Sequence, residues 1–394
     1  MSGSAYRVDS TTQKLGWDSK LRMEAGVQDV FSDFSGIYTD QTKDVGNAIT
    51  VKVKAEKGEH NRTITLMRPL SGGGVQGRDS QMGAEETQLT RSLKVYANTY
   101  SNGVVTETYG IDNHDASYLD VIGEVQPQES RWHKEIEGKH IREALVENVS
   151  SNLEAAPTSL SAGINSNVLV LDEGIFGSTK ITYSSTALTY ATAIGTATDL
   201  STPDSTNRYS QITLNHIIYQ AQLNEIEQIN IGGKATWILT VPSRQKINLF
   251  APGTSGFSKL VEQTDVRGPG NRALSYILGR YGPLLLVEDP RSPVAVIDAT
   301  TFTPGYKGPG TTDGRTLAAG NNNFDVGMLL GKGSVYEFEA QQLAFKEEVQ
   351  DYEKTRGIAA VRTTGWVSGV FDATTPTDTS IVNKSSMLII AGSN

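Results

Sequence analysis

The sequence predicts an α+β protein with three parts: an extended β-hairpin, one long helix and a compact mixed α/β body. Residues 41–92 are polar but have clear strand signals, residues 131–150 have an amphipathic helix pattern, and helix and strand signals alternate over residues 206–287. The chain has 394 residues, enough for two or three domains. Hydrophobic residues make up 37% before glycine is counted, so the chain can bury a core.

Charge and residue usage exclude several functions. The 35 basic and 44 acidic residues give a net charge of −9, which disfavours sequence-independent binding to DNA. Cysteine is absent, which excludes disulfides, thiolate metal sites and cysteine nucleophiles. Residues 1–20 lack the apolar core of a secretory signal, and no apolar run approaches the ~18 residues of a membrane-spanning helix. We therefore expect neither Sec-type export nor membrane insertion.

The first part of the chain is predicted to be a loose arm, a short helix and a set of strands. Over residues 17–34 apolar side chains recur at three- or four-residue steps, as in an amphipathic helix. From Ala48 the pattern changes to period two, with Ile49, Val51 and Val53 on one face of a strand. A polar tip and the remaining strands of the hairpin are predicted at residues 56–62, 64–66 and 89–95.

The hairpin segment 41–92 is predicted to be too polar to form its own core. Leu, Ile, Val and Phe number 9 of its 52 residues, below the ~20% that a folded chain normally needs. Ribbons of two or three strands are marginal alone in water. We expect this ribbon to lie on a neighbouring copy, because a strand edge can join another sheet through main-chain hydrogen bonds. The alternative is a mobile surface hairpin.

A long helix is predicted over residues 131–150, with Trp132 and Leu145 on its apolar stripe. Four residues of alternating charge at i,i+4 spacing are expected on a solvated opposite face: Arg131, Glu135, Lys139 and Glu143.

The body is predicted from a second series of elements. They are a helix at 206–230, a strand at 235–240, a helix after Pro242 and a strand at 284–287. The remaining segments are expected to be a Ser/Thr/Ala-rich surface β insertion at 176–207, a loop at 304–323 and a strand-rich tail at 324–371.

Two glycine motifs invite a nucleotide-binding interpretation. Gly72, Gly74 and Gly77 spell G-x-G-x-x-G, which can cradle a pyrophosphate in a strand-to-helix turn. Residues 78–83 are not the apolar start of a helix, so a flexible turn is favoured. The second motif, residues 331–334, lacks the spacing of a P-loop.

His133, Glu137 and His140 lie on one face of the predicted long helix, which invites a metal-site interpretation. The two histidines are separated by about 10.5 Å along the axis, whereas metal–ligand bonds are close to 2 Å. We favour a solvated or interface face and expect no metal and no other cofactor. The other histidines are isolated in the sequence: His60, His114 and His216.

Signals for an enzyme are weak. The chain has no G-x-S-x-G nucleophile elbow. Its pairs of neighbouring acids would point to opposite faces of a strand: Glu85-Glu86, Glu288-Asp289 and Glu347-Glu348. We expect no catalytic residues; the alternative is a hydrolase that acts through Glu or Asp.

The order of the parts and several short motifs resemble the major capsid proteins of tailed bacteriophages, which share the Johnson-type capsid fold. The run GGGVQGRDSQMGAEE, residues 72–86, is similar to a branch with a glycine-valine-x-glycine turn followed by a glycine and paired glutamates. Gln81 and Met82 depart from the leucine and glutamate of that branch. Further similar stretches, in its closing strands and before the strand at 284–287, are residues 325–331, 345–352, 357–359 and 279–282.

The resemblance implies a division of the chain. It comprises an N-terminal arm with a short helix (1–47), an extended loop (48–105), a peripheral domain with a spine helix (106–160), an axial domain with the Ser/Thr-rich insertion (161–323), returning peripheral strands (324–371) and a C-terminal extension (372–394).

The resemblance also implies a function. The chain would be a virion protein, assembled in the host cytoplasm as a homo-oligomer of hexamers and pentamers in an icosahedral shell around packaged DNA. Portal, scaffolding and decoration proteins are implied partners. The alternative is another phage or surface-array structural protein, such as a tail-tube, decoration or surface-layer protein.

Overall fold

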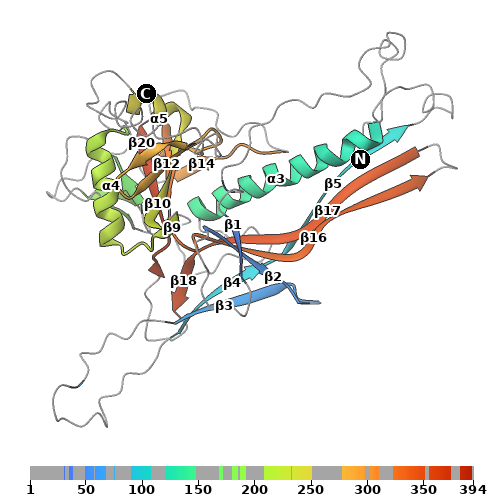
Figure 1. Cartoon of the computed structure of the whole chain (residues 1–394), viewed down its shortest axis with the longest axis horizontal. Coiled ribbons are helices and arrows are strands. Elements are labelled where there is room, and N and C mark those ends of the chain that lie inside the picture. The colour runs from blue at the N-terminus through green and yellow to red at the C-terminus, as the bar shows by residue number, and fades with distance from the viewer. Residues whose placement is uncertain are drawn as a thin grey trace.

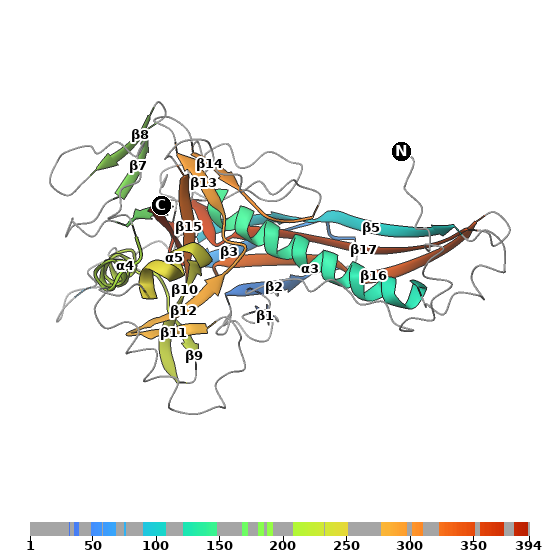
Figure 2. The same cartoon turned by 90° about the horizontal axis from the view of Figure 1, so that it is seen from above.

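A computed structural model shows a compact body from which one long helix and three long strands extend to one side (Figures 1 and 2). The structure describes residues 31, 35–38, 49–56, 58–67, 75, 90–107, 121–147, 168–171, 180–184, 187–191, 208–231, 233–250, 277–297, 302–309, 323–350, 355–373 and 382–392.

The body is built on an eleven-stranded mixed sheet, with the main order β11-β12-β10-β15-β20-β6-β7-β8. Its main strands are β6 (Val168–Val170), β7 (Lys180–Ser184), β8 (Ala187–Ala191), β10 (Lys234–Pro242), β11 (Ile277–Tyr281), β12 (Leu284–Asp289), β15 (Asn323–Leu330) and β20 (Ser386–Gly392). Attached to them are β9 (Ile229–Ile231), β13 (Val294–Ile297) and β14 (Phe302–Gly305). β10 and β12 are parallel, and helix α5 (Ser243–Phe250) follows β10, which confirms the predicted alternation.

Both faces of the body sheet are covered. Helix α4 (Gln211–Leu223) packs Leu214 and Ile217 against one face, with Leu329 and Ile389 of the sheet. The other face contacts the last turns of helix α3 (Val121–Glu147). Alternate residues of a strand face opposite sides of the sheet. A sheet that is buried on both faces therefore needs strands that are apolar at nearly every position. β15 and β20 are buried at every position.

A second sheet, which we call the platform, has five strands in the order β1-β2-β16-β17-β5. They are β1 (Ser35–Tyr38), β2 (Thr50–Lys54), β5 (Asn98–Glu107), β16 (Val335–Gln350) and β17 (Thr355–Ser368). Helix α3 lies along β5, β16 and β17, so the platform is a thin layer of one helix on one sheet (Figure 2). The register of β16 against β17 shifts between Glu339 and Ala344.

A third, four-stranded sheet has the order β19-β18-β4-β3. Its strands are β3 (Asn61–Met67), β4 (Thr90–Tyr96), β18 (Val370–Ala373) and β19 (Val382–Asn383). β3 and β4 form the predicted hairpin, with Met67 opposite Thr90 at its outer end. Residues 56–62 are not the tip of this hairpin; they connect β2 in the platform to β3 and begin β3 itself.

Both predicted long helices have different ends in the structure. α3 begins at Val121, ten residues before the predicted start, and Pro127 lies inside it; Val125, in the added part, is buried. α4 ends at Leu223, since Glu225 has a positive φ of 50°, which a helix does not accommodate. The apolar residues that follow α4 bury without a helix: Ile226 and Ile229.

The last described strand of the chain is part of the body sheet. Residues 372–394 were expected to be an extension, yet β20 lies between β15 and β6 in the body sheet. β15 also belongs to the body and not with β16 and β17. The short helix predicted at 17–34 lies outside the described residues except for Phe31, which is buried.

Candidate functional site

The histidine face of α3 is turned toward the platform and away from solvent. His133 is buried and its Nε2 donates a hydrogen bond to the carbonyl oxygen of Ala360 at 3.3 Å. The His140 ring stacks on Trp366, with 5.4 Å between ring centroids. Glu137 turns instead to a charge cluster described below. Of the two expected surroundings, a solvated or an interface face, the solvated one is wrong, and the three side chains have separate partners.

The other candidate groups do not converge either. Glu288 accepts a hydrogen bond from Lys246 at 2.6 Å, whereas its neighbour Asp289 accepts from Arg142. This divergence confirms the prediction for adjacent acids on a strand. The part of the chain that the structure describes contains no group of three or more His, Asp or Glu suited to a metal ion. Within the same residues, no helix is long and apolar enough to cross a membrane.

The glycines near residue 331 are required by packing. A Cβ atom at Gly331 would lie 2.2 Å from the carbonyl oxygen of Glu227. The backbone N–H of Gly331 donates a hydrogen bond to the carbonyl oxygen of Ser385 at 2.7 Å. A Cβ atom at Gly327 would lie 2.1 Å from the hydroxyl oxygen of Tyr209. These positions bring β15 into close contact with its neighbours, which leaves no space for a phosphate. The other motif, at residues 72–77, lies outside the described residues apart from residue 75.

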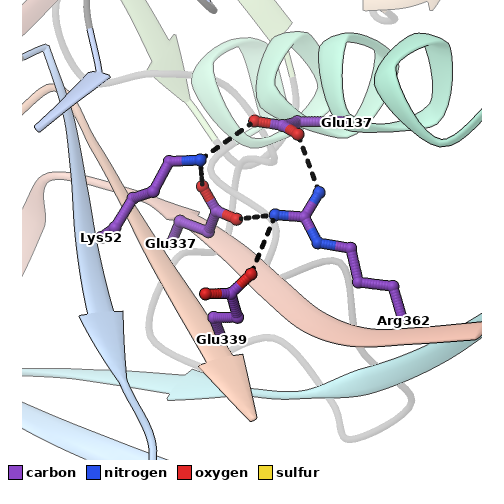
Figure 3. Close-up of polar contacts among 5 residues, drawn as sticks. All are labelled: Lys52, Glu137, Glu337, Glu339 and Arg362. Atoms are coloured by element: carbon purple, nitrogen blue, oxygen red, sulfur yellow. Dashed lines mark hydrogen bonds and ion pairs between the residues drawn. The ribbon is translucent and has the colours of Figure 1, made fainter. Parts of the chain in front are cut away.

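Five charged side chains meet between α3 and the platform, and we call them the charge cluster (Figure 3). They are Lys52 of β2, Glu137 of α3, Glu337 and Glu339 of β16, and Arg362 of β17. Arg362 donates to Glu137 at 2.8 Å and to Glu337 at 2.5 Å. The Lys52 Nζ atom lies 3.2 Å from Glu337 and 3.8 Å from Glu137. The cluster therefore joins the helix to three adjacent strands.

The charges in this cluster do not balance. Three carboxylates face two cations, so one negative charge remains when every group is ionised. The side chain of Glu337 is 0% exposed, and burial together with repulsion from Glu137 raises its pKa to about 7. Burial alone would lower the pKa of Arg362, but Glu137, Glu337 and Glu339 raise it. A proton held on Glu337 near neutral pH gives the cluster equal numbers of positive and negative charges.

A second set of buried ion pairs joins α3 to the body. Arg142 donates to Asp289 of β12 through Nε at 3.0 Å and through Nη2 at 2.8 Å, and both side chains are almost fully buried. Its third nitrogen donates to the carbonyl oxygen of Gly138 at 2.8 Å. Arg291 donates to Glu135 at 2.9 Å, about two helical turns before Arg142. Helix α3 is thus anchored to both sheets by charged hydrogen bonds.

Sequence reasoning did not single out these charged residues as contacts. Glu337 does leave a signal, since it interrupts an apolar run between Tyr336 and Phe338. A charged residue at a buried strand position needs a partner of opposite charge. The partner comes from Arg362, 25 residues further along the chain, and the sequence alone does not say which of the many basic residues it is.

The polar hairpin divides into an inner and an outer part. Val51 and Val53 of β2 are buried in a cluster with Leu93, Val95 and Phe371. The prediction that residues 41–92 lack a core is therefore wrong for β2. It holds better for β3, where alternate side chains are exposed as far as Met67, which is 66% exposed. Association of the ribbon with a neighbouring copy stays a prediction.

Comparison by sequence finds no relative. No model of a protein family matches the chain, and no curated protein does.

Comparison by structure finds phage capsids that match over the full length. The capsid of Ralstonia phage GP4 has a TM-score of 0.67 and 13% identity, covering 100% of this chain and 99% of that one. The Cyanophage Pam1 capsid has a TM-score of 0.63 and 14% identity over 99% of both chains. The acid-stable capsid of Helicobacter pylori bacteriophage KHP30 has a TM-score of 0.62 and 11% identity over 100% of both. The chain therefore has the phage capsid fold.

Proposed function

We propose that this chain is a major capsid protein, which assembles with copies of itself into the icosahedral shell of a tailed bacteriophage around packaged DNA. The observation that carries the proposal is the agreement of fold over essentially the whole chain with proteins of phage capsids. The role is structural. Virion localisation, assembly in the host cytoplasm and an arrangement in hexamers and pentamers follow from the same proposal.

The parts of the fold can be assigned to parts of such a subunit. Helix α3 is the spine helix, and with β5, β16 and β17 it makes the peripheral domain. The body sheet with α4 and α5 is the axial domain, to which β15 and β20 also belong. The β3–β4 hairpin is the stem of the extended loop, and residues 1–47 are the arm. The axial domain therefore includes β20, which lies in the segment expected to be a C-terminal extension.

The shape of the platform supports this function physically. Helix α3 covers one face of the platform and the third sheet covers only the inner part of the other face, so the outer part is accessible to neighbours. On β5, alternate residues are exposed: Thr99, Ser101, Gly103 and Val105. A closed shell needs many modest contacts, because symmetry multiplies each of them. Portal, scaffolding and decoration proteins would bind the assembled shell.

The overall charge fits a container for DNA. A net charge of −9 gives no general attraction to phosphates, so the shell would not grip the packaged genome. Enclosure requires no sequence-specific binding.

Electron microscopy of the purified full-length chain tests the proposal. Closed shells of uniform diameter are expected. Tubes would indicate a tail-tube protein and flat arrays a surface-layer protein, and either would contradict the proposal. Particles that form only by binding to another phage shell would indicate a decoration protein.

Shortening the hairpin tests the function of the extended loop. Met67 and Thr90 are paired at the outer end of the described hairpin, so replacement of residues 68–89 by Asn-Gly closes it with a two-residue turn. We expect a soluble, folded chain with unchanged helix content that forms no shells. Circular dichroism and electron microscopy measure the two properties.

The matched control keeps the length of the loop. In this control, residues 68–89 are replaced by a Gly/Ser segment of equal length. It shows whether shell assembly needs the side chains of the loop or only a connection of that length. Shell formation by the Asn-Gly variant would show that the loop has no part in assembly.

A further inference from the structure

Helix α4 has an outward face that the fold of the chain does not explain. Three large apolar side chains lie on it at i, i+7 and i+11: Ile212, Tyr219 and Leu223, which are 40%, 57% and 55% exposed. The opposite face already provides the buried residues that cover the body sheet, among them Leu214 and Ile217. Ser210 forms a capping box with Thr213, so the start of the helix is fixed without the outward residues.

The same helix has no Asp, Glu, Lys or Arg. The charge-free run extends over residues 209–224, although 20% of the whole chain is charged. Helix α3, in contrast, has ten charged residues in its 27. The first acid after α4 is Glu225, and it forms an ion pair with Lys384. An exposed helix normally has charges on its solvent face, so this one has the character of a covered surface.

We propose that the outward face of α4 is a contact between copies of this chain. A molecule with a net charge of −9 repels its own copies, and a face without acids is where two of them can approach most closely. A basic partner would instead be drawn to acidic surface. Both views place α4 at the outside of the body, at the end of the molecule opposite the tips of β16 and β17 (Figures 1 and 2).

The contact has a geometric consequence. Copies that meet through α4 meet body to body, and their platforms point away from the shared contact. The inference rests on the proposed function in that the copies belong to one shell. It adds the surface by which the bodies associate and the three side chains at its centre.

The absence of cysteine allows a direct test. Tyr219→Cys introduces a single thiol on the proposed contact, and Ile247→Cys introduces one on α5 at a side chain that is 71% exposed but off the contact. Both thiols should react equally with a maleimide in the unassembled chain. In shells, labelling of the α4 thiol should slow by at least about tenfold, because the core of an interface excludes water, and the α5 thiol should not change. Equal labelling of both thiols in shells would overturn the proposal.

Charged substitutions test whether the contact contributes to assembly. Leu223→Glu places an acid on the face, and Ile247→Glu adds the same charge elsewhere on the body. Both residues are exposed, so folding should be retained, which circular dichroism checks. We expect Leu223→Glu to raise the concentration needed for assembly by about tenfold or more, and Ile247→Glu to leave it unchanged. Equal effects of the two substitutions would contradict the proposal.

The outcomes also separate this inference from the proposed function. Shells formed normally by Leu223→Glu, with Tyr219→Cys fully labelled, would remove the α4 contact and leave the capsid function in place. Tubes or sheets formed by the wild type, with the α4 thiol protected, would remove the capsid function and leave the contact. Protection of the thiol only by a different added protein would assign the face to that protein and refute contact between copies.

Discussion

The body sheet and the platform are held together in different ways. β15 and β20 of the body are buried on both faces by apolar side chains from α3 and α4. The platform has α3 on one face, and the helix is fixed to it by the charge cluster and by the rings of His140 and Trp366. Apolar burial is insensitive to pH, whereas a buried ion cluster is not.

This difference suggests a division of tasks. The body has an apolar core on both faces of its sheet, whereas the platform shares an apolar core only at its inner end and continues outward as a thin layer. The charged contacts of α3 lie where the helix crosses from one sheet to the other, since Arg142 reaches the body and Glu137 reaches the platform. Substitutions in the two regions should therefore differ in size and in their dependence on pH.

The largest effect is expected where α3 meets the body. Arg142→Met leaves Asp289 buried without its bidentate partner, which should lower the free energy of unfolding by about 3–5 kcal/mol. Chemical denaturation of the unassembled chain measures it. The double variant Arg142→Met, Asp289→Leu removes both charges and should recover most of the loss. An equal loss of unfolding free energy in the double and single variants would show that the unpaired buried charge of Asp289 is not the cause of the loss.

The second largest difference is expected when one leucine in each region is shortened to alanine. Leu388 is 1% exposed in the body core, and Leu343 is half-buried on the outer part of β16. Leu388→Ala should cost about 2–5 kcal/mol because it leaves a cavity, whereas Leu343→Ala should cost about 1 kcal/mol or less. The midpoints of urea unfolding provide the comparison. Similar costs at the two positions would contradict the contrast between the regions.

The charge cluster should give a smaller effect with a distinctive dependence on pH. The pKa of Glu337 is raised from 4.5 to about 7, so between these values the native protein holds a proton that the unfolded chain has released. Stability from this group is therefore present at pH 4.5 and below, and it is lost as the pH rises toward and through 7. Glu337→Gln removes the titration and should flatten this part of the profile by on the order of 1–2 kcal/mol.

Thermal unfolding at several pH values between 5 and 9 measures this change. Glu339→Gln is the matched control, because Glu339 has a longer contact with Arg362, at 3.5 Å, and its side chain is partly exposed. Its profile should follow that of the wild type. An unchanged profile for Glu337→Gln would show that Glu337 is already ionised across this range.

The sequence predicted much of the fold because the relevant signals are local. A period-two apolar pattern predicted β2, an uninterrupted apolar run predicted β12, and helical periodicity predicted α3 and α4. The pairing of these elements is not local. β20 lies beside β15 although more than fifty residues separate them, so the sequence alone does not show that residues 386–392 belong to the body sheet. The helix ends were missed because tertiary packing overrides local signals at Pro127 and Glu225.

The candidate site could be predicted only in part. The polar hairpin followed from composition, and its stem is present as β3 and β4. The charge cluster did not follow, because it brings together residues from β2, α3, β16 and β17. The uncharged face of α4 is visible in the sequence as a gap between Arg208 and Glu225, but its exposure required the structure.

The mass of the purified chain in solution, measured by light scattering over a wide range of concentration, tests the central claim most directly. A chain that completes its contacts on its own copies should change sharply from a single subunit to large closed particles, with few intermediates, because closure makes assembly cooperative. A mass of 42.5 kDa at every concentration, with the β3–β4 hairpin protected from hydrogen exchange in that monomer, would contradict it.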